Sequence, residues 1–136
     1  MPKVKSKLKM SFYLSRTQYW CIQYLIIVTN RNASEIIDEA IKYSIRYLNE
    51  TRTNPRRPKL PTKSVRQTAN IPRETAIAAG LVKINKEFFG WSNTDFVRYG
   101  LTHTLASYKE RYPVMRKIEN KYDLYQGENN SLEAFE

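Results

Sequence analysis

Two short segments of this 136-residue chain place polar side chains at every second position. Residues 9–14 and 65–71 alternate polar with apolar types, apart from Gln67, and this is the period of a β-strand that buries one face. The polar positions are Lys9, Ser11, Tyr13, Arg66, Thr68 and Asn70. Lysine and arginine can bond guanine O6 and N7, asparagine can bond adenine, and hydroxyls can bond either base. These six side chains are therefore candidates for reading base edges, and the alternative is an ordinary solvated sheet face.

Each predicted strand is followed by two predicted helices. Ser15, with Gln18 three residues later, is typical of a capping box and predicts a helix over residues 16–29. Because this segment is apolar nearly all round, we expect it to be buried. An amphipathic helix is then predicted over residues 32–48.

The same order returns after the second strand. Pro72 suits the first position of a helix over residues 73–89, because its missing N–H costs nothing there. Gly90 is the predicted stop of this helix. The segment carries large apolar side chains at Ile77, Leu81, Ile84, Phe88 and Phe89.

The second helices of the two halves share a pattern at a spacing of 60 residues. Asn32 is a good N-cap with Glu35 three residues on, and Ser92 and Asp95 repeat this at the start of a helix over residues 92–108. No residue is identical between the two helices, yet cap, acid and apolar face coincide. This indicates an internal repeat, and two unrelated helices in one bundle are the alternative.

The amino ends of these two helices are candidate phosphate sites. Backbone N–H groups at a helix N-terminus are free to bind an anion. The residues concerned are Asn32, Ala33, Ser34, Ser92, Asn93 and Thr94. Plain capping without a ligand is the alternative, and both can hold at once.

The pattern divides the chain into five parts. They are a basic arm over residues 1–8, a first strand–helix–helix unit over 9–48, a linker over 49–63, a second unit over 64–108, and a C-terminal part over 109–136. The linker holds three prolines and five basic residues, which favours extended chain. In the C-terminal part we expect an amphipathic docking helix, and disorder beyond Gly127.

The charge is unevenly distributed. Of the net charge of +10, all lies in residues 1–75, which hold 15 basic and 5 acidic residues. From Tyr122 onward there are four acidic residues and no basic one. A basic front is typical of a partner that is a polyanion, and it makes Lys3, Lys5 and Lys7 candidates for non-specific DNA contacts. A solvated basic surface is the alternative.

The order strand–helix–helix, occurring twice, resembles the ribbon-helix-helix DNA-binding proteins, the class of the MetJ, Arc and CopG repressors. The similarity covers about residues 9–48 and 66–108. The turn at residues 90–95, GWSNTD, is close to the Gly-x-Ser-x-Ser/Thr turn of that family, whereas Arg31 stands at the glycine position of the first copy. Tyr13 is bulkier than the usual reader.

The resemblance implies a fold and a mode of binding. The fold is mainly α with a short two-stranded antiparallel β-ribbon, in which two ribbon-helix-helix repeats form an intrachain pseudo-dimer. The ribbon enters the major groove, three outward residues of each strand touch base edges, and the N-terminus of each second helix holds a backbone phosphate.

Two copies in one chain resemble the fused, TraY-like members of the family, which assist plasmid transfer. This implies a relaxosome accessory protein that binds double-stranded DNA at a transfer origin, with a relaxase or coupling protein meeting the C-terminal tail. A repressor of its own or neighbouring genes is the alternative. A helical interaction protein that does not bind DNA is a third, less favoured reading.

Enzymatic chemistry is not expected. His103 is the only histidine and lies on the helix face opposite Leu101 and Leu105, and Cys21 lies in an apolar helix as a core residue. There is no Walker, CxxC or GxGxxG motif, so we expect neither metal nor cofactor. One cysteine, no secretory signal and a longest apolar run of residues 25–28 favour the cytoplasm over the membrane.

Overall fold

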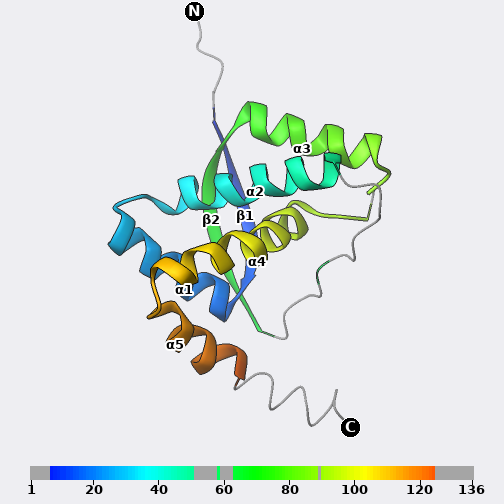
Figure 1. The fold of residues 1–136 in the computed structure, drawn as a ribbon. Coiled ribbons are helices and arrows are strands. Elements are labelled where there is room, and N and C mark those ends of the chain that lie inside the picture. The colour runs from blue at the N-terminus through cyan, green and yellow to red at the C-terminus, as the bar shows by residue number, and fades with distance from the viewer. Residues whose placement is uncertain (1–6, 51–57, 59–62, 89, 125–136) are drawn as a thin grey trace, which may run out of the picture.

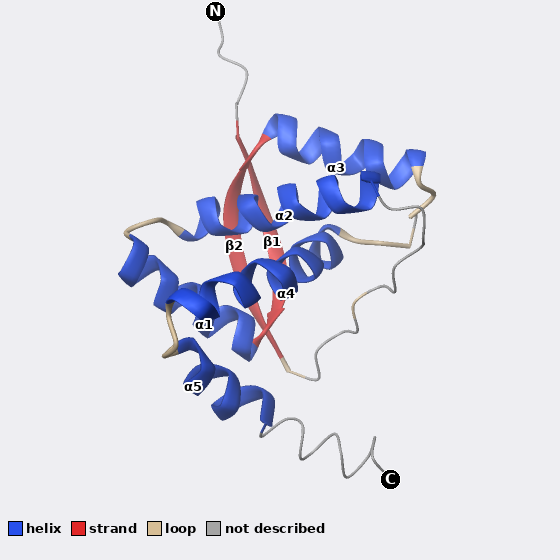
Figure 2. Cartoon of the chain, in the orientation of Figure 1, coloured by secondary structure: helices blue, strands red, loops and turns tan. Residues whose placement is uncertain are grey.

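The protein is mainly helical, with one two-stranded antiparallel sheet (Figure 1, Figure 2). The structure is a computed structural model that describes residues 7–50, 58, 63–88 and 90–124. Strand–helix–helix occurs twice along the chain, and a short helix and a helical turn follow. The elements are β1 (Lys7–Ser15), α1 (Arg16–Thr29), α2 (Ala33–Glu50), β2 (Ser64–Pro72), α3 (Arg73–Asn85), α4 (Asn93–Arg111), α5 (Met115–Glu119) and a π-helical turn (Asn120–Leu124).

The two strands pair along their whole length. Lys7 faces Pro72 at one end, Ser15 faces Ser64 at the other, and Ser11 faces Thr68 at the centre. The predicted inward positions are buried under the helices at Phe12, Leu14, Ala69 and Ile71. The alternation read from the sequence is therefore confirmed, because one face of the ribbon is part of the core and the other is not.

Gln67, the polar exception in the inward row, is half-buried and faces Phe12 across the ribbon. Its side-chain oxygen accepts a hydrogen bond from Nε2 of Gln23 in α1 at 3.3 Å, and its own Nε2 donates to the carbonyl of Thr68 at 2.8 Å. Both ends of the amide are bonded, which offsets the cost of placing it beside the core.

The predicted cap residues are confirmed at three of the four long helices, and the fourth, α3, begins at Arg73 as predicted. Ser15 and Gln18 form a complete capping box on α1, and Ser92 and Asp95 form one on α4. The side-chain oxygen of Asn32 accepts a hydrogen bond from the backbone N–H of Glu35 at 2.9 Å. In return, the Glu35 carboxylate accepts one from the backbone N–H of Asn32 at 3.2 Å. Pro72 is the N-cap of α3 and the last residue of β2, and not the first helical residue that its type suggested.

The prediction that the third helix continues to residue 89 is wrong. The helix ends at Asn85, and Glu87 rather than Gly90 takes the left-handed conformation, with φ of 60°. The amide of Phe88 bonds back to the carbonyl of Lys83 at 2.8 Å. Phe88 then packs against Trp91, with ring centroids 5.4 Å apart, and this buried aromatic contact takes the chain out of the helix.

The prediction that the first helix is buried nearly all round is wrong. α1 buries one face only, and Trp20, Ile27 and Val28 are exposed on the other. On α3 the small residues Ala79 and Val82 are buried, whereas the large apolar residues of the helix are exposed. The apolar composition of these helices therefore exceeds what the core of this small domain covers.

The second helices cross at very close range. α2 and α4 pack against each other, and Gly100 of α4 lies directly against Ala40 of α2, so that a Cβ built at residue 100 would lie 1.9 Å from the Ala40 carbonyl oxygen. Beside this crossing the buried Ser44 hydroxyl donates to the carbonyl of Phe96 at 2.6 Å. Only glycine at position 100 permits this approach of the two backbones.

The chain after α4 contains the predicted docking helix. α5 and the helical turn pack on α1 (Figure 1), where Tyr122 stacks on Trp20 with ring centroids 6.4 Å apart. Met115 is fully buried, and Tyr112 meets Tyr24 edge to face. The acidic tail beyond residue 124, the arm over residues 1–6 and most of the linker lie outside the described residues, although positions 49 and 50 of the predicted linker belong to α2.

Within the described residues, none of the helices combines the length and the apolar character needed to cross a membrane.

The helix crossing yields a stability prediction. Gly100→Ala should lower the free energy of unfolding by about 1–3 kcal/mol, because the added methyl group meets backbone atoms that cannot move aside. Gly80→Ala in α3 is the matched control: nothing lies within 4 Å of its new Cβ, so it should raise stability by about 0.5–1 kcal/mol through helix propensity. Urea unfolding measures both, and equal effects would contradict the close crossing.

Candidate nucleic-acid interface

The six sequence-predicted base readers lie together on the face of the ribbon that is turned away from the core. They form three cross-strand pairs, which are Lys9 with Asn70, Ser11 with Thr68, and Tyr13 with Arg66. All are exposed except Ser11, which is half-buried. The tertiary structure thus brings two rows, which are more than 50 residues apart in sequence, into one surface.

Arg66 is held across the ribbon. Its Nε and Nη2 atoms donate to the Ser11 hydroxyl oxygen at 3.2 and 3.0 Å. This diagonal contact orients the guanidinium over the centre of the row, and the Ser11 hydroxyl proton stays free to donate to another acceptor.

The ribbon carries positive charge and no acidic residue. Its basic residues are Lys7, Lys9 and Arg66. Lys7 was assigned to the arm from the sequence, but it is the first residue of β1 and is exposed, two positions before Lys9 in the same row. The signal for it was present, because the alternation of polar positions extends back to residue 7. Lys3 and Lys5 lie outside the described residues.

Each second helix begins against the outer edge of the ribbon. The backbone N–H of Asn70 donates to the Ser34 hydroxyl at 2.9 Å, and the backbone N–H of Tyr13 donates to the Thr94 hydroxyl at 3.2 Å. Outer edges of a two-stranded sheet leave N–H groups without a strand partner, and these hydroxyls satisfy them. No sequence pattern indicated these bonds, which fix each helix terminus beside a predicted base reader.

The side chains of Asn32 and Ser92 are engaged in their capping boxes. The first intrahelical bonds are donated by Ile36 and Phe96. The amides of Ala33, Ser34, Asn93 and Thr94 precede these bonds, so by helix geometry they point out of the helix end. Since Glu35 and Asp95 add negative charge at the same ends, anion binding there depends on these amides and on nearby cations.

Two further cations stand at the ends of the ribbon. Arg16 follows β1 directly and Arg73 follows β2, each as the first residue of its helix. Sequence reasoning did not single them out. The sequence did contain a signal for them, because each arginine lies at the same place after its strand.

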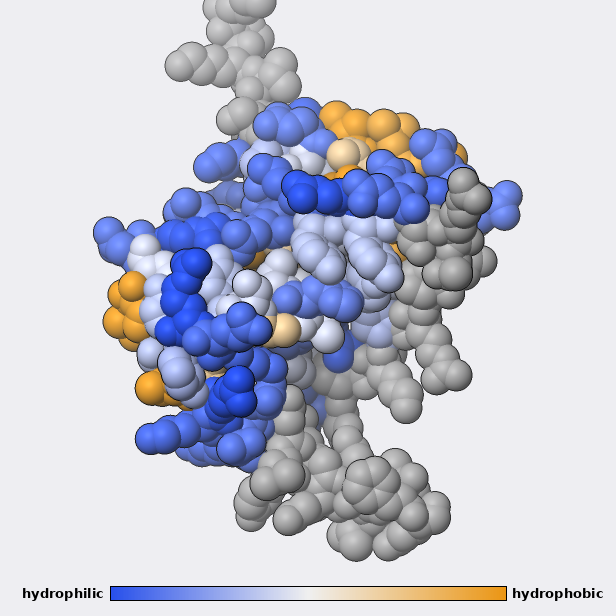
Figure 3. Space-filling model, in the orientation of Figure 1, coloured by the Kyte–Doolittle hydropathy of each residue, from blue (hydrophilic) through white to orange (hydrophobic). Residues whose placement is uncertain are grey.

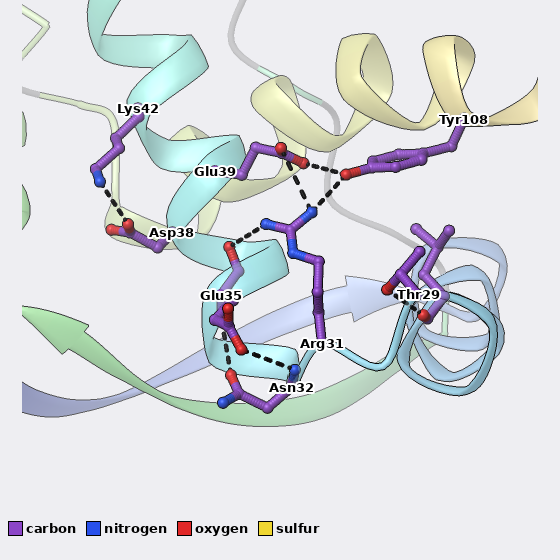
Figure 4. A network of polar contacts seen from close by, with 9 residues as sticks. Thr29, Arg31, Asn32, Glu35, Asp38, Glu39, Lys42 and Tyr108 are labelled. Atoms are coloured by element: carbon purple, nitrogen blue, oxygen red, sulfur yellow. Dashed lines mark hydrogen bonds and ion pairs between the residues drawn. The ribbon is translucent and has the colours of Figure 1, made fainter.

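Ionisable groups with perturbed pKa values lie on the helical side of the molecule. Asn30, and not Arg31 at the predicted glycine position, takes the left-handed conformation in the turn between α1 and α2, with φ of 55°. Arg31 then reaches over α2 (Figure 4), donates to the Tyr108 hydroxyl at 2.6 Å and pairs with Glu39 at 3.5 Å. Tyr108 donates to Glu39 at 2.7 Å.

Burial and the neighbouring charges together explain the pKa shifts in this network. Burial by itself lowers the pKa of Arg31, but Glu39 and Tyr108 outweigh it and the pKa is raised. Burial, and then Glu39, raise the pKa of Tyr108. The network joins the α1–α2 turn to α4 and has a structural role.

An aromatic cluster occupies the exposed surface of the α2–α4 pair. It consists of Tyr43, Tyr47, Tyr99 and His103. His103 is exposed, with Leu101 and Leu105 buried on the opposite helix face, as the sequence indicated, and Cys21 is buried. Burial, and then the neighbouring Tyr47, raise the pKa of Tyr99 to about 12. Among the described residues no group of three histidine, cysteine or acidic side chains could hold a metal ion.

Comparisons of the chain with family models, with curated proteins and with solved structures find no match.

The shifted Tyr99 predicts a pH dependence of stability. Because its folded-state pKa of about 12 lies above the ordinary value of 10.0, the folded chain keeps a proton that the unfolded chain releases. The free energy of unfolding should therefore fall as the pH rises from 10 towards 12, and this loss should be smaller in Tyr99→Phe. Urea unfolding at a series of pH values measures both proteins, and identical slopes would contradict the assignment.

Proposed function

We propose that this protein binds double-stranded DNA in a sequence-specific manner by placing the β1–β2 ribbon in the major groove. The observation that carries the proposal is the exposed row of six polar side chains on an acid-free ribbon flanked by two helix N-termini. The major groove admits a two-stranded ribbon, and the donors and acceptors in the row match the patterns that base edges present there.

The internal correspondence of the two halves supports a pseudo-dimer of ribbon-helix-helix repeats within one chain. In the strands, residues of the two halves correspond when their numbers differ by 57: Lys9 corresponds to Arg66, Ser11 to Thr68 and Tyr13 to Asn70. The same difference relates the start of α1 to the start of α3. In the second helices the difference is 60 residues, so that Ser34 corresponds to Thr94 and Ala40 to Gly100.

Under this correspondence the two edge contacts are counterparts of each other. The second helix of each half holds the strand of the other half, through Ser34 to Asn70 and through Thr94 to Tyr13. A two-fold axis through the Ser11–Thr68 pair and the Ala40–Gly100 contact would relate them. This exchange of contacts is what two intertwined copies produce.

Phosphate contacts would come from both sides of the row. The amides at the starts of α2 and α4 are suited to a phosphate on either strand of the duplex. Arg16 and Arg73 add charge at the ribbon ends. Such contacts set the position of the protein on DNA, and the row selects the sequence.

Within DNA binding we favour a relaxosome accessory role at a plasmid transfer origin, and a repressor is the second candidate. The two halves of the row differ in charge, length and bonding pattern, so the site they select is directional, which suits a transfer origin more than a symmetric operator. A cytoplasmic location and a relaxase or coupling protein at the C-terminal tail belong to the same proposal. An adaptor that binds no nucleic acid would not need the alternation of donors over a buried row.

Base selection provides the main test. Arg66→Ala should cost about 1–3 kcal/mol of binding free energy and relax preference at one base pair, and Lys9→Ala should do so at a different base pair in the other half of the site. Arg116→Ala, at an exposed position of α5, is the control and should leave preference unchanged. Selection from randomised duplexes with each protein measures this. A strictly palindromic site, or loss of the same base in both variants, would show that the row does not read DNA as proposed.

The basic arm predicts a second, sequence-independent effect. A chain that lacks residues 1–6 loses Lys3 and Lys5 and should bind every duplex more weakly. The slope of log K against log salt should become shallower by roughly 2, because each phosphate contact releases about 0.9 counterion. Fluorescence anisotropy with specific and random duplexes at several salt concentrations measures this, and a changed sequence preference at unchanged affinity would mean that the arm reads bases.

A further inference from the structure

Arg66, the one arginine in the polar row of the ribbon, is held by a residue that is not its direct cross-strand partner. In the register Arg66 faces Tyr13, yet its side chain lies diagonally across the ribbon and bonds the hydroxyl of Ser11. Diagonal neighbours on one face of an antiparallel pair are within reach of long side chains. Because Ser11 faces Thr68 at the centre of the ribbon, this contact draws the guanidinium inward along the row.

The two hydrogen bonds occupy one particular edge of the guanidinium. Nε and Nη2 donate to the Ser11 oxygen at 3.2 and 3.0 Å. These two nitrogens form the side edge of the planar group, so the end edge, with Nη1 and the second proton of Nη2, is left for another acceptor. Arg66 is exposed, and this edge is therefore open to a ligand.

Ser11 contributes one further donor. Its oxygen accepts both bonds from Arg66, which uses its two lone pairs, and its hydroxyl proton is left to donate. Arg66 and Ser11 together thus present hydrogen-bond donors and no acceptor.

The charge of Arg66 is not matched by its partner. The other face of the molecule, formed by α2 and α4, is hydrophilic as well (Figure 3), but there Arg31 pairs with the carboxylate of Glu39 at 3.5 Å (Figure 4). On the ribbon the partner is a neutral hydroxyl, and neither β1 nor β2 holds an acidic residue. The contact with Ser11 fixes the geometry of the guanidinium and leaves its positive charge available, which favours an electronegative pair of acceptors.

Of the four bases, guanine matches this set of donors best. In the major groove guanine presents two acceptors, O6 and N7, whereas adenine and cytosine present amino groups that are themselves donors. Thymine presents a single acceptor beside a methyl group. The end edge of an arginine can bond both guanine acceptors at once, and an arginine already held in place has less freedom to lose on binding.

The other half of the ribbon has no equivalent of this arrangement. Lys9 is the counterpart of Arg66, and Thr68 is the counterpart of Ser11. A lysine ammonium is a point charge on a flexible stem and lacks the planar fork that lets one hydroxyl fix one edge while the other edge stays free.

We propose that Arg66 and Ser11 read one base pair as a single unit, which selects guanine in one half of the DNA site. Ser11 is a positioning residue in this unit: it acts at the base pair that Arg66 contacts, although it lies on the same strand as Lys9. The inference rests on the proposed function, because it requires that the ribbon lies in the major groove.

The contact within the unit is tested first in the free protein. Exchange of the Arg66 Nε proton with water, followed by NMR, should be at least severalfold slower than that of Arg116, which is exposed on α5. Ser11→Ala should raise the Arg66 rate to that of Arg116, and Ser11→Thr, which keeps the hydroxyl and suits a strand, should keep it slow. Equal rates for the two arginines in the native chain would overturn the proposal.

The reading of guanine is tested by selection from randomised duplexes. The native chain should select guanine at the base pair whose preference Arg66→Ala relaxes. Ser11→Ala should lower the discrimination at that same base pair roughly threefold to tenfold, because the arginine must then be ordered on binding. It should cause no further loss in the Arg66→Ala background, and Ser11→Thr should retain the preference.

Two controls separate positioning from a general effect. Ser107→Ala, which removes an exposed hydroxyl from α4, should leave every preference unchanged. Replacing the selected guanine by 7-deazaguanine removes the N7 acceptor, and it should weaken binding of the native chain severalfold but leave binding of Arg66→Ala unchanged. If Ser11 were needed only for the fold, Ser11→Ala would weaken binding to all duplexes alike.

The outcomes distinguish the unit from the function on which it rests. Selection of another base at the Arg66 position, or a Ser11→Ala effect at a different base pair, would overturn the unit and leave sequence-specific binding in place. Absence of binding to any duplex would reject the proposed function and the reading of guanine with it, whereas the exchange rates would still show whether Ser11 holds Arg66.

Discussion

The antiparallel pairing of β1 with β2 is the constraint on which the rest of this structure depends. The paired residues lie 49 to 65 positions apart in the chain, so the ribbon forms only when both halves are folded around it. An isolated pair of strands is marginal in water, and this pair is stabilised by burying Phe12, Leu14, Ala69 and Ile71 under the helices. The exposed polar row exists because the opposite face of the same strands belongs to the core.

The second helices, α2 and α4, connect the core to the two edges of the ribbon. Gly100 lets α2 and α4 approach until their backbones are in contact, which fixes the position of one helix against the other. At those beginnings Ser34 and Thr94 accept the edge N–H groups of Asn70 and Tyr13. The helix ends proposed to hold phosphate and the strands proposed to read bases are thereby fixed relative to each other, and binding requires little reorganisation of the protein. The perturbed pKa values belong to groups packed on the helices, where partial burial and neighbouring charges are sufficient to explain them.

The two halves of the chain follow the same plan and differ in what surrounds them. α1 is partly covered by α5, whereas no described element packs on the corresponding side of α3, where Ile77, Leu81 and Ile84 are exposed. The polar row is likewise unequal, with a lysine, a serine and a tyrosine on one strand and an arginine, a threonine and an asparagine on the other. In a pair of identical chains neither difference could arise. Joining both halves in one chain allows each to change alone, and this gives the proposed complex on DNA a direction.

Features that depend on near neighbours in the chain could be predicted from the sequence. Alternation placed both strands, cap residues placed the starts of α1, α2 and α4, and the single histidine and cysteine were correctly assigned to surface and core. Other features became visible only in the folded chain. They are the register that places Ser11 opposite Thr68 and the hydrogen bonds of Ser34 and Thr94 to the ribbon. The hydrogen bonds of Arg31 and the position at which α3 ends belong to the same group. So does the exposure of Ile77, Leu81 and Ile84. The physical reason is the same in each case: a local pattern shows that a helix or strand has an apolar face or a free donor, but what covers that face or accepts that hydrogen comes from a segment far away in the sequence.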